Sequence, residues 1–531
     1  MGRNFVGAER DQLFLLPPDA RQWLPERHLA WAVLEQAGQM DLGPFLSWYR
    51  ADGQGRPAYH PRLMVTLIMY CYCKGIRSSR AVEMATFDDV GARVICGNLH
   101  PDHATIARFV TRHEQPVKGL LVASLTACAR EGLVSVEVVA GDGTKVKASA
   151  SMAANAAAER LEIEIGELEA LLAAEVDGWL AQARAADAAE DALFGGGDGP
   201  GAGGGPGTLA RLTDKIVRRR KARARLEAGE QARQQDAGAD REATITAARD
   251  RVTRAEQRAA REEAAAAAKV AGYQARAAAK AAAGGRKGPD GRVPVAPGDS
   301  AHVRQARQAA AHARRKLAEA VAAPAAAAAP DPPPKANTTD PASRVMPAKK
   351  GGFGQLYNLQ VIAGGHQVIT AIATRDNPAD TGALHPMLDL ARANLRAAGI
   401  AGQIRKALFD AGYASEDNFT TPCEPDLYVA VTKEARQTGR LRDGKTASPR
   451  QPGWQAMAAR LDTPDGKAAY KQRAGMIEPV FAQLFNRLGR HLNYRDTKVD
   501  LELHLWAATH NLLKAIRARA RHAASQPALA S

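Results

Sequence analysis

Residues 133–151 read LVSVEVVAGDGTKVKASAS, and the interpretation of the whole chain depends on this stretch. Two runs rich in β-branched residues flank Gly-Asp-Gly, and Asp-Gly between two such runs is a typical hairpin turn. In an uninterrupted strand, by contrast, Asp142 shares the parity of the apolar residues before it, so its carboxylate points to the apolar face. A carboxylate on that face needs a partner or a cation. The stretch alone leaves both interpretations open.

Charge and hydropathy narrow the class of protein. The chain has 531 residues, enough for several domains, and its 72 Lys and Arg against 57 Asp and Glu give a net charge of +15. Such an excess favours a polyanion as partner, and nucleic acid is the first candidate. No apolar run is long enough to span a membrane, and the N-terminal stretch lacks the apolar core of a secretory signal. We therefore expect a cytoplasmic protein without a membrane partner.

Residues 1–132 have the pattern of an all-α domain. The apolar run HPRLMVTLIMYCYCKGI (60–76) predicts a helix, and further helices are predicted over 78–97, which begins with serines, and 101–113, which begins with Pro-Asp. Short helices with tight turns and scattered arginines are typical of helix-turn-helix modules that bind DNA, and a plain helical bundle is the alternative. The arginines that we expect to contact DNA are Arg77, Arg80, Arg108 and Arg112.

A long segment of different composition, residues 152–335, interrupts the globular patterning. It is rich in Ala, Arg, Lys and Glu, and we expect long helices with few apolar anchors, connected by flexible linkers at 195–207 and 284–300. Helices that are polar nearly all round form projecting hairpins or coiled coils, or remain partly disordered. The low apolar content of this insertion predicts that it builds no core of its own.

Globular patterning returns over residues 336–521, before a tail at 522–531 that is predicted to be disordered. Together with the segment 133–151, this part predicts an α/β core, a mixed sheet with flanking helices, because strand-like and helix-like stretches alternate. The predicted strands are 357–364, 366–374, 404–410 and 426–431, and the predicted helices are 378–399, 470–495 and 501–521.

Three carboxylates fall into one pattern along these elements. Asp142 and Asp410 each come at a strand end with a glycine close by, and Glu478 lies in a later helix. Ligand sites of α/β sheets gather outside such strand ends. A dense group of carboxylates binds two hard divalent cations, which can activate water or a 3′ hydroxyl and stabilise the leaving oxygen of a phosphodiester. The structural alternatives are a hairpin turn for Asp142, a turn cap for Asp410 and a helix start for Glu478.

Several stretches of the chain carry a family resemblance. In the predicted core they are GDGTKVKASAS (141–151), NTTDPASRVM (337–346), GGFGQLYNLQV (351–361), FDAGYAS (409–415) and the block from YKQRAGMIEPVF to HNLLK (470–514). In the N-terminal part they are 59–83 and 97–109. With these stretches the chain resembles bacterial insertion-sequence transposases of the DDE type, which have a ribonuclease H-like catalytic core and a helical N-terminal domain.

The resemblance implies a site and an activity. Asp142, Asp410 and Glu478 would be the catalytic triad that binds two Mg²⁺ or Mn²⁺ ions, and Tyr470 and Arg473 would belong to the Tyr-Arg-Glu pattern, with Arg473 as a phosphate contact. The implied activity is cleavage of DNA strands at the element ends and strand transfer into target DNA. The implied partners are double-stranded DNA and further copies of the chain, as a homodimer or higher oligomer on DNA, at the bacterial nucleoid.

Two positions depart from the family pattern. Phe485 stands where a Lys is common, two turns after the glutamate, and Arg-Asp (495–496) stands where Arg-Gly is common. These departures leave a second hypothesis open, a transposase-derived protein that binds DNA but no longer cuts it. A third hypothesis, a structural coiled-coil protein, has only the insertion 152–335 in its favour.

Overall fold

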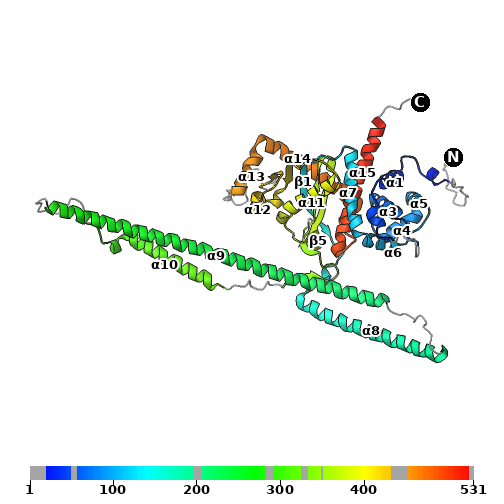
Figure 1. Ribbon diagram of the computed structural model, residues 1–531, viewed down its shortest axis with the longest axis horizontal. Coiled ribbons are helices and arrows are strands. Elements are labelled where there is room, and N and C mark those ends of the chain that lie inside the picture. The colour runs from blue at the N-terminus through cyan, green and yellow to red at the C-terminus, as the bar shows by residue number, and fades with distance from the viewer. Residues whose placement is uncertain are drawn as a thin grey trace, which may run out of the picture. The chain divides into compact units, whose positions relative to one another are not determined.

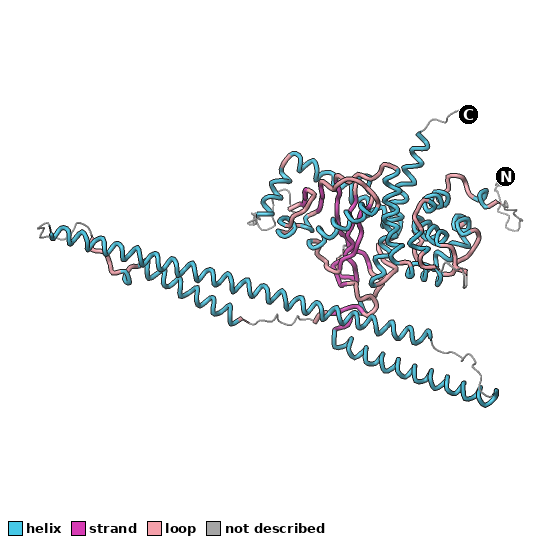
Figure 2. Tube along the Cα trace, in the orientation of Figure 1, coloured by secondary structure: helices cyan, strands magenta, loops and turns pink. Residues whose placement is uncertain are grey.

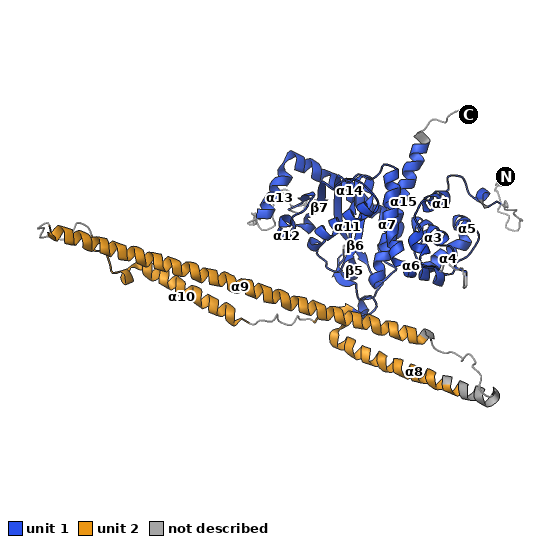
Figure 3. Cartoon of the chain, in the orientation of Figure 1, with its two compact units in different colours: residues 1–155, 337–531 blue, residues 156–336 orange. Residues whose placement is uncertain are grey.

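The computed structural model describes residues 19–49, 57–194, 206–282, 292–323, 333–348, 351–431 and 452–525 (Figure 1). Most strands gather in one part of the chain and helices make up most of the rest (Figure 2). The chain divides into two compact units, one formed by Met1–Asn155 with Asn337–Ser531 and one by Ala156–Ala336 (Figure 3). No helix among the described residues is long and apolar enough to cross a membrane.

The larger unit contains a six-stranded mixed sheet, which confirms the predicted mixed sheet with flanking helices. β1 pairs antiparallel with β5 on one side and parallel with β7 on the other, and β7 pairs parallel with β8. β4 and β6 pair antiparallel with β5. The strands are β1 (Val138–Lys147), β4 (Arg344–Pro347), β5 (Phe353–Ala363), β6 (Ile369–Arg375), β7 (Lys406–Phe409) and β8 (Asp426–Val429).

β1 runs without interruption through Gly-Asp-Gly, so the hairpin interpretation of this stretch is wrong. Asp142 pairs with Val361 of β5, and the glycines on both sides of it pair in the same ladder. Neither position has room for a side chain. A Cβ on Gly141 would collide with the ring of Phe409, and one on Gly143 would lie 2.5 Å from Nε2 of Gln360. Glycine in a strand often marks such a close approach.

Helices cover both faces of the sheet. α11 (Leu384–Ala397) packs on the face that holds Val139 and Ile362, because its Leu and Met side chains repeat at helical spacing. α14 (Pro464–Leu488) and α15 (Val499–Ser525) pack on the other face, with Ala140 and Val146. Since α15 continues as a helix to Ser525, the predicted disordered tail begins too early. Residues 526–531 lie outside the described residues.

The N-terminal helices belong to the same unit as the sheet. α15 packs along α7 and α3, and their buried side chains join those of α14 in one hydrophobic cluster. The boundary predicted near residue 132 therefore does not separate two cores. The helices are α1 (Leu29–Gly38), α2 (Gly43–Leu46), α3 (Pro61–Cys73), α4 (Ser79–Asp88), α5 (Val90–Cys96), α6 (His103–Arg112) and α7 (Glu114–Arg130).

The helix predicted over 78–97 is in fact two helices, α4 and α5. Asp89 separates them with an extended backbone, and its carboxylate accepts hydrogen bonds from the N–H of Ala92 and the O–H of Tyr70. Ser78 caps the start of α4 and Gly97 ends α5 in the left-handed conformation, as the sequence predicted for the two ends. Asp, a good N-cap residue, is thus the signal for the break.

The second unit consists of three helices, α8 (Ala158–Phe194), α9 (Pro206–Ala282) and α10 (Ala301–Ala322), with α8 and α10 packed against α9 (Figure 1). Ion pairs join them, for example Arg219–Glu164 at 2.6 Å and Arg314–Glu256 at 2.5 Å. Short strands β2 (Asn155–Ala157) and β3 (Lys335–Asn337) pair where the chain enters and leaves this insertion. Most of the two predicted linkers, residues 195–205 and 283–291, lies outside the described residues.

Candidate active site

Two of the three predicted acids meet on neighbouring parallel strands. Ala140 of β1 is in register with Leu408 of β7, and two residues further along each strand come Asp142 and Asp410. Because side chains alternate between faces, both carboxylates lie on the face of the sheet that α14 covers. Asp410 follows the last residue of β7 and accepts a hydrogen bond from the N–H of Gly412 at 2.9 Å.

Arg473 of α14 reaches both carboxylates. Its Nη2 atom lies 3.0 Å from Oδ2 of Asp142 and 3.9 Å from Oδ2 of Asp410, and only 6% of its side chain is exposed. The two acids therefore converge on one positive group. Arg473 was expected to contact DNA phosphate, but the structure places it in the interior, against the acids.

The environment of Asp142 disfavours its ionised form. Burial raises the pKa of this carboxyl to about 6, and the negative charges of Asp410 and Asp380 act in the same direction. The guanidinium of Arg473 and the N–H of Gly143 oppose the shift without cancelling it. A carboxylate held in this way gains from a nearby divalent cation, which removes the cost of its charge.

Glu478 lies on α14, within the helix and not at its start, so the helix-start alternative is wrong. Its side chain is exposed. Pro479, the next residue, has no N–H for the carbonyl oxygen of Gly475, and Nε2 of Gln367 donates to that oxygen at 3.3 Å. The helix is thereby connected to the turn between β5 and β6.

The side chains at this site supply some of the ligands that a hard divalent cation needs. Carboxylate oxygens are the ligands that Mg²⁺ and Mn²⁺ prefer, and Asp142 and Asp410 supply them on one face. Within the described parts of the chain, no group of three or more His, Cys, Asp or Glu lies close enough together to hold a metal ion. The geometry thus brings together Asp142 and Asp410 and leaves Glu478 apart from them.

The two departures from the family pattern have structural explanations. Phe485 is buried, with its ring 5.9 Å from that of Phe481 and 6.5 Å from that of Trp506, so it is a core residue. Tyr470, one of the predicted DNA contacts, also packs against this core. Asp496 has a φ of 54°, the left-handed region that favours Gly and that Asp tolerates better than most residues.

The predicted DNA-contacting arginines divide into two groups. Arg77 is buried: its Nη1 donates to Oε1 of Glu502 and to the carbonyl oxygen of His491, both at 2.8 Å. Its assignment as a DNA contact is corrected, because the side chains of Arg77 and Glu502 are both buried. Arg80, Arg108 and Arg112 are exposed on α4 and α6.

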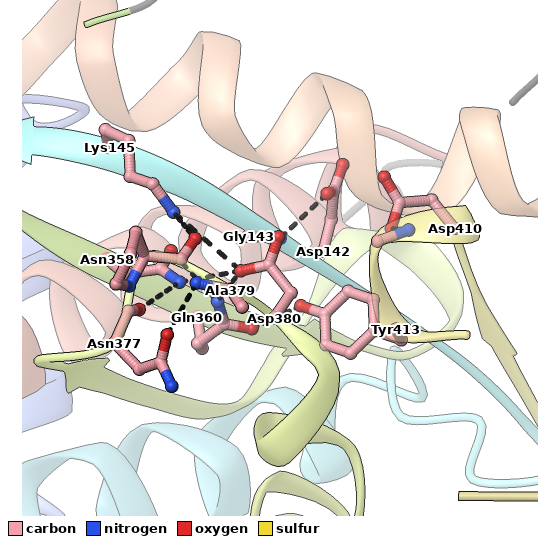
Figure 4. A network of polar contacts seen from close by, with 12 residues as sticks. Asp142, Gly143, Lys145, Asn358, Gln360, Asn377, Ala379, Asp380, Asp410 and Tyr413 are labelled. Atoms are coloured by element: carbon pink, nitrogen blue, oxygen red, sulfur yellow. Dashed lines mark hydrogen bonds and ion pairs between the residues drawn. The ribbon is translucent and has the colours of Figure 1, made fainter. Parts of the chain in front are cut away.

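A network of polar side chains lies beside Asp142 and Asp410 and was not predicted from the sequence (Figure 4). Asp380, just before α11, accepts hydrogen bonds from the amides of Asn358 and Gln360, each at 2.7 Å. The signal was in the sequence: Asn358 and Gln360 alternate with apolar residues in YNLQVIA, so both point to one face of β5. Buried polar residues at alternate positions of a strand need a common partner on that face.

Two parts of the chain match known protein families, and both families are described as transposase domains. Residues 18–112 match the family described as "Transposase domain (DUF772)", and residues 437–516 match the family described as "Transposase DDE domain". The second match includes Arg473 and Glu478 but neither aspartate. Searches among curated proteins and among solved structures found no match. Both matches support an insertion-sequence transposase of the DDE type.

Proposed function

We propose that this transposase cleaves DNA strands at the ends of its element and transfers them into target DNA, in a reaction that depends on divalent metal ions. The observation that carries the proposal is the pair Asp142, on β1, and Asp410, directly after the parallel strand β7, which both face one buried guanidinium. This arrangement collects negative charge at a partly buried place, where a cation is bound more strongly than at a fully exposed surface.

The sheet supports a ribonuclease H-like core. β5, β1, β7 and β8 lie in this order, and β4 and β6 both pair with β5. The pairs of β5 with β1, β4 and β6 are antiparallel, and the pairs of β7 with β1 and β8 are parallel. β1 and β7 are the neighbours at the change from antiparallel to parallel pairing, and they carry the two acids. Ligand sites of α/β sheets gather at such switch points.

In this proposal Asp142 and Asp410 hold two Mg²⁺ or Mn²⁺ ions, and Glu478 supplies a further carboxylate from α14. When bound, such ions activate the attacking hydroxyl and stabilise the leaving oxygen of the phosphodiester. Arg473 keeps the two aspartates facing each other by contacting both. Because Arg473 and Glu478 lie on the same helix, a small movement of α14 relative to the sheet changes the position of both residues.

The partner is double-stranded DNA, both the element ends and the target. Arg80, Arg108 and Arg112 are exposed and provide positive charge on the N-terminal helices, and the chain as a whole carries a net charge of +15. We also propose a homodimer or higher oligomer on DNA at the nucleoid, since two element ends must be cut and joined in one event.

The test is a nicking and strand-transfer assay with the full chain and DNA from the flanks of its gene, at several Mg²⁺ and Mn²⁺ concentrations. Asp142→Asn, Asp410→Asn and Glu478→Gln should each abolish cleavage and leave DNA binding intact. Asp389→Asn is a matched control, because Asp389 lies exposed on α11 and pairs with Arg392 at 3.1 Å, away from the proposed site. Binding without metal-dependent cleavage by the unaltered chain would support the non-catalytic alternative, which no observation favours at present.

A further inference from the structure

Asp380 lies next to the backbone segments that carry both aspartates. A Cβ on Gly143, the residue after Asp142, would lie 2.7 Å from Oδ1 of Asp380. A Cβ on Gly412, whose N–H binds Asp410, would lie 3.1 Å from Oδ2 of Asp380. The Asp380 carboxylate therefore touches both segments, one with each oxygen.

Buried groups hold the Asp380 carboxylate in this place (Figure 4). Asn358 and Gln360, which donate to Oδ1, are both fully buried on β5. The O–H of Tyr413, in the turn after Asp410, donates to Oε1 of Gln360. Since every member has a partner in this network, its geometry is rigid.

A lysine completes the network. Nζ of Lys145 lies 3.9 Å from Oδ1 of Asp380 and donates to the carbonyl oxygen of Pro378 at 2.7 Å. Lys145 is on β1, three residues after Asp142, so it connects that strand to the segment before α11. With 21% of its side chain exposed, and 22% of that of Asp380, the pair is only partly accessible to solvent.

The side chains of Asp142 and Asp380 lie on opposite faces of the sheet. Gly143 is paired with Gln360 and Lys145 with Asn358, so these residues share the face of Asp380, whereas Asp142 points to the face of α14. Asp380 therefore does not compete with Asp142 for space. It acts on the aspartates through the backbone and through its charge.

We propose that Asp380 is a positioning residue for the metal-binding pair. It fixes the separation of Asp142 and Asp410 by contacting Gly143, the residue after Asp142, and Gly412, whose N–H binds Asp410, and its negative charge behind the sheet strengthens the attraction for divalent cations. The inference rests on the proposed metal-dependent function and extends it to a fourth carboxylate outside the predicted triad.

The test is Mn²⁺ binding to the full chain without DNA, followed by electron paramagnetic resonance and calorimetry. Asp380→Asn keeps the size of the side chain and an oxygen for Asn358 and Gln360, but removes the charge. We expect Mn²⁺ affinity to fall about 10-fold and cleavage to fall about 10- to 100-fold, the range for residues behind metal ligands. Asp389→Asn should bind and cleave as the unaltered chain does.

A second variant covers the case in which Asp380→Asn does not fold. A Cβ on Gly143 would meet Nε2 of Gln360 at 2.5 Å as well as Oδ1 of Asp380 at 2.7 Å, so this test is made in a Gln360→Ala background. There Gly143→Ala should lower Mn²⁺ affinity by a similar factor, and adding Asp380→Ala should remove the loss that the methyl group causes. A loss from Gly143→Ala that persists together with Asp380→Ala would overturn the contact between Asp380 and Gly143 as the cause.

Asp142→Asn separates the two proposals. If Asp142→Asn loses Mn²⁺ binding and Asp380→Asn binds normally, only the role of Asp380 is wrong. If Asp142→Asn also binds Mn²⁺ as the unaltered chain does, the proposed metal site itself is wrong.

Discussion

At the residue scale, Asp142 shows a conflict between folding and binding. Its pKa is raised to about 6 by burial, so folding makes the ionised form, which is the form that binds a cation, less favourable than it is in the unfolded chain. A group whose pKa is higher in the folded than in the unfolded state stabilises the fold at low pH. That contribution is lost as the pH rises through about 6.

Asp142→Asn should therefore stabilise the protein when divalent cations are absent. At pH 7 to 8 we expect a melting temperature about 2 to 4 °C higher, which corresponds to roughly 1 kcal/mol in a domain of this size. At about pH 2.5, below the pKa of an unfolded Asp, the difference should vanish, because the carboxyl is then protonated in both states. Differential scanning calorimetry at both pH values measures it. A lower melting temperature at neutral pH would mean that the pair with Arg473 outweighs the cost of burial.

Phe485 gives a second prediction for a single residue. Replacing it with the lysine that is common in the family should destabilise the protein by about 3 kcal/mol or more, since an unpaired charge and a cavity replace a packed ring. Phe485→Leu is the control for volume and should cost less. Chemical denaturation measures both. A stable Phe485→Lys variant with faster cleavage would show that the position belongs to the active site.

At the scale of elements, a buried ion pair joins the N-terminal helices to the helices on the sheet. Glu502 of α15 accepts hydrogen bonds from Arg77 at 2.8 Å and from the N–H groups of Asn493 and Tyr494 at 2.8 and 3.0 Å. Arg77 lies between α3 and α4. The pair therefore connects the segment between α3 and α4 to the C-terminal part of the chain, 425 residues later.

Arg77→Ala should destabilise the fold by about 3 to 5 kcal/mol, because the buried Glu502 charge loses its partner. Arg80→Ala, three residues further along, should leave the melting temperature unchanged and weaken DNA binding, more at low salt than at high salt. Thermal denaturation and a salt series of DNA affinities distinguish the two. Equal melting temperatures for both variants would contradict the interior role of Arg77.

These elements also show what the sequence could predict. Strand parity placed Asp142 on the apolar face, and the spacing of apolar residues located α11, because both are local patterns. Arg77 was misassigned since its partner, Glu502, comes 425 residues later. Asp380 was missed for the same reason: its meaning depends on the contacts with Gly143 and Gly412, which no local pattern reveals.

At the scale of the whole molecule, the insertion is a separate unit whose ends lie on paired strands, β2 and β3. Replacing residues 158–334 with a short Gly-Ser turn should therefore leave the larger unit folded, with one cooperative transition at an unchanged temperature. Circular dichroism and calorimetry of this variant test it. In the full chain, proteases should cut first within 195–207 and 284–300. Loss of the cooperative transition in the shortened variant would show that the larger unit needs the insertion to fold.

The pairing of β2 with β3 has a consequence for folding during synthesis. β1 ends at Lys147, but its neighbours β5 and β7 begin only at Phe353 and Lys406. At about 5 to 20 residues per second, the ribosome needs on the order of 10 to 40 s between β1 and β5. Throughout this time both edges of β1 lack their strands and are open to aggregation. Helices with local contacts form as they emerge. When these helices bring β2 and β3 together, the loop of about 200 residues between β1 and β5 is in effect replaced by a short one. The shorter loop lowers the entropy cost of pairing β1 with β5.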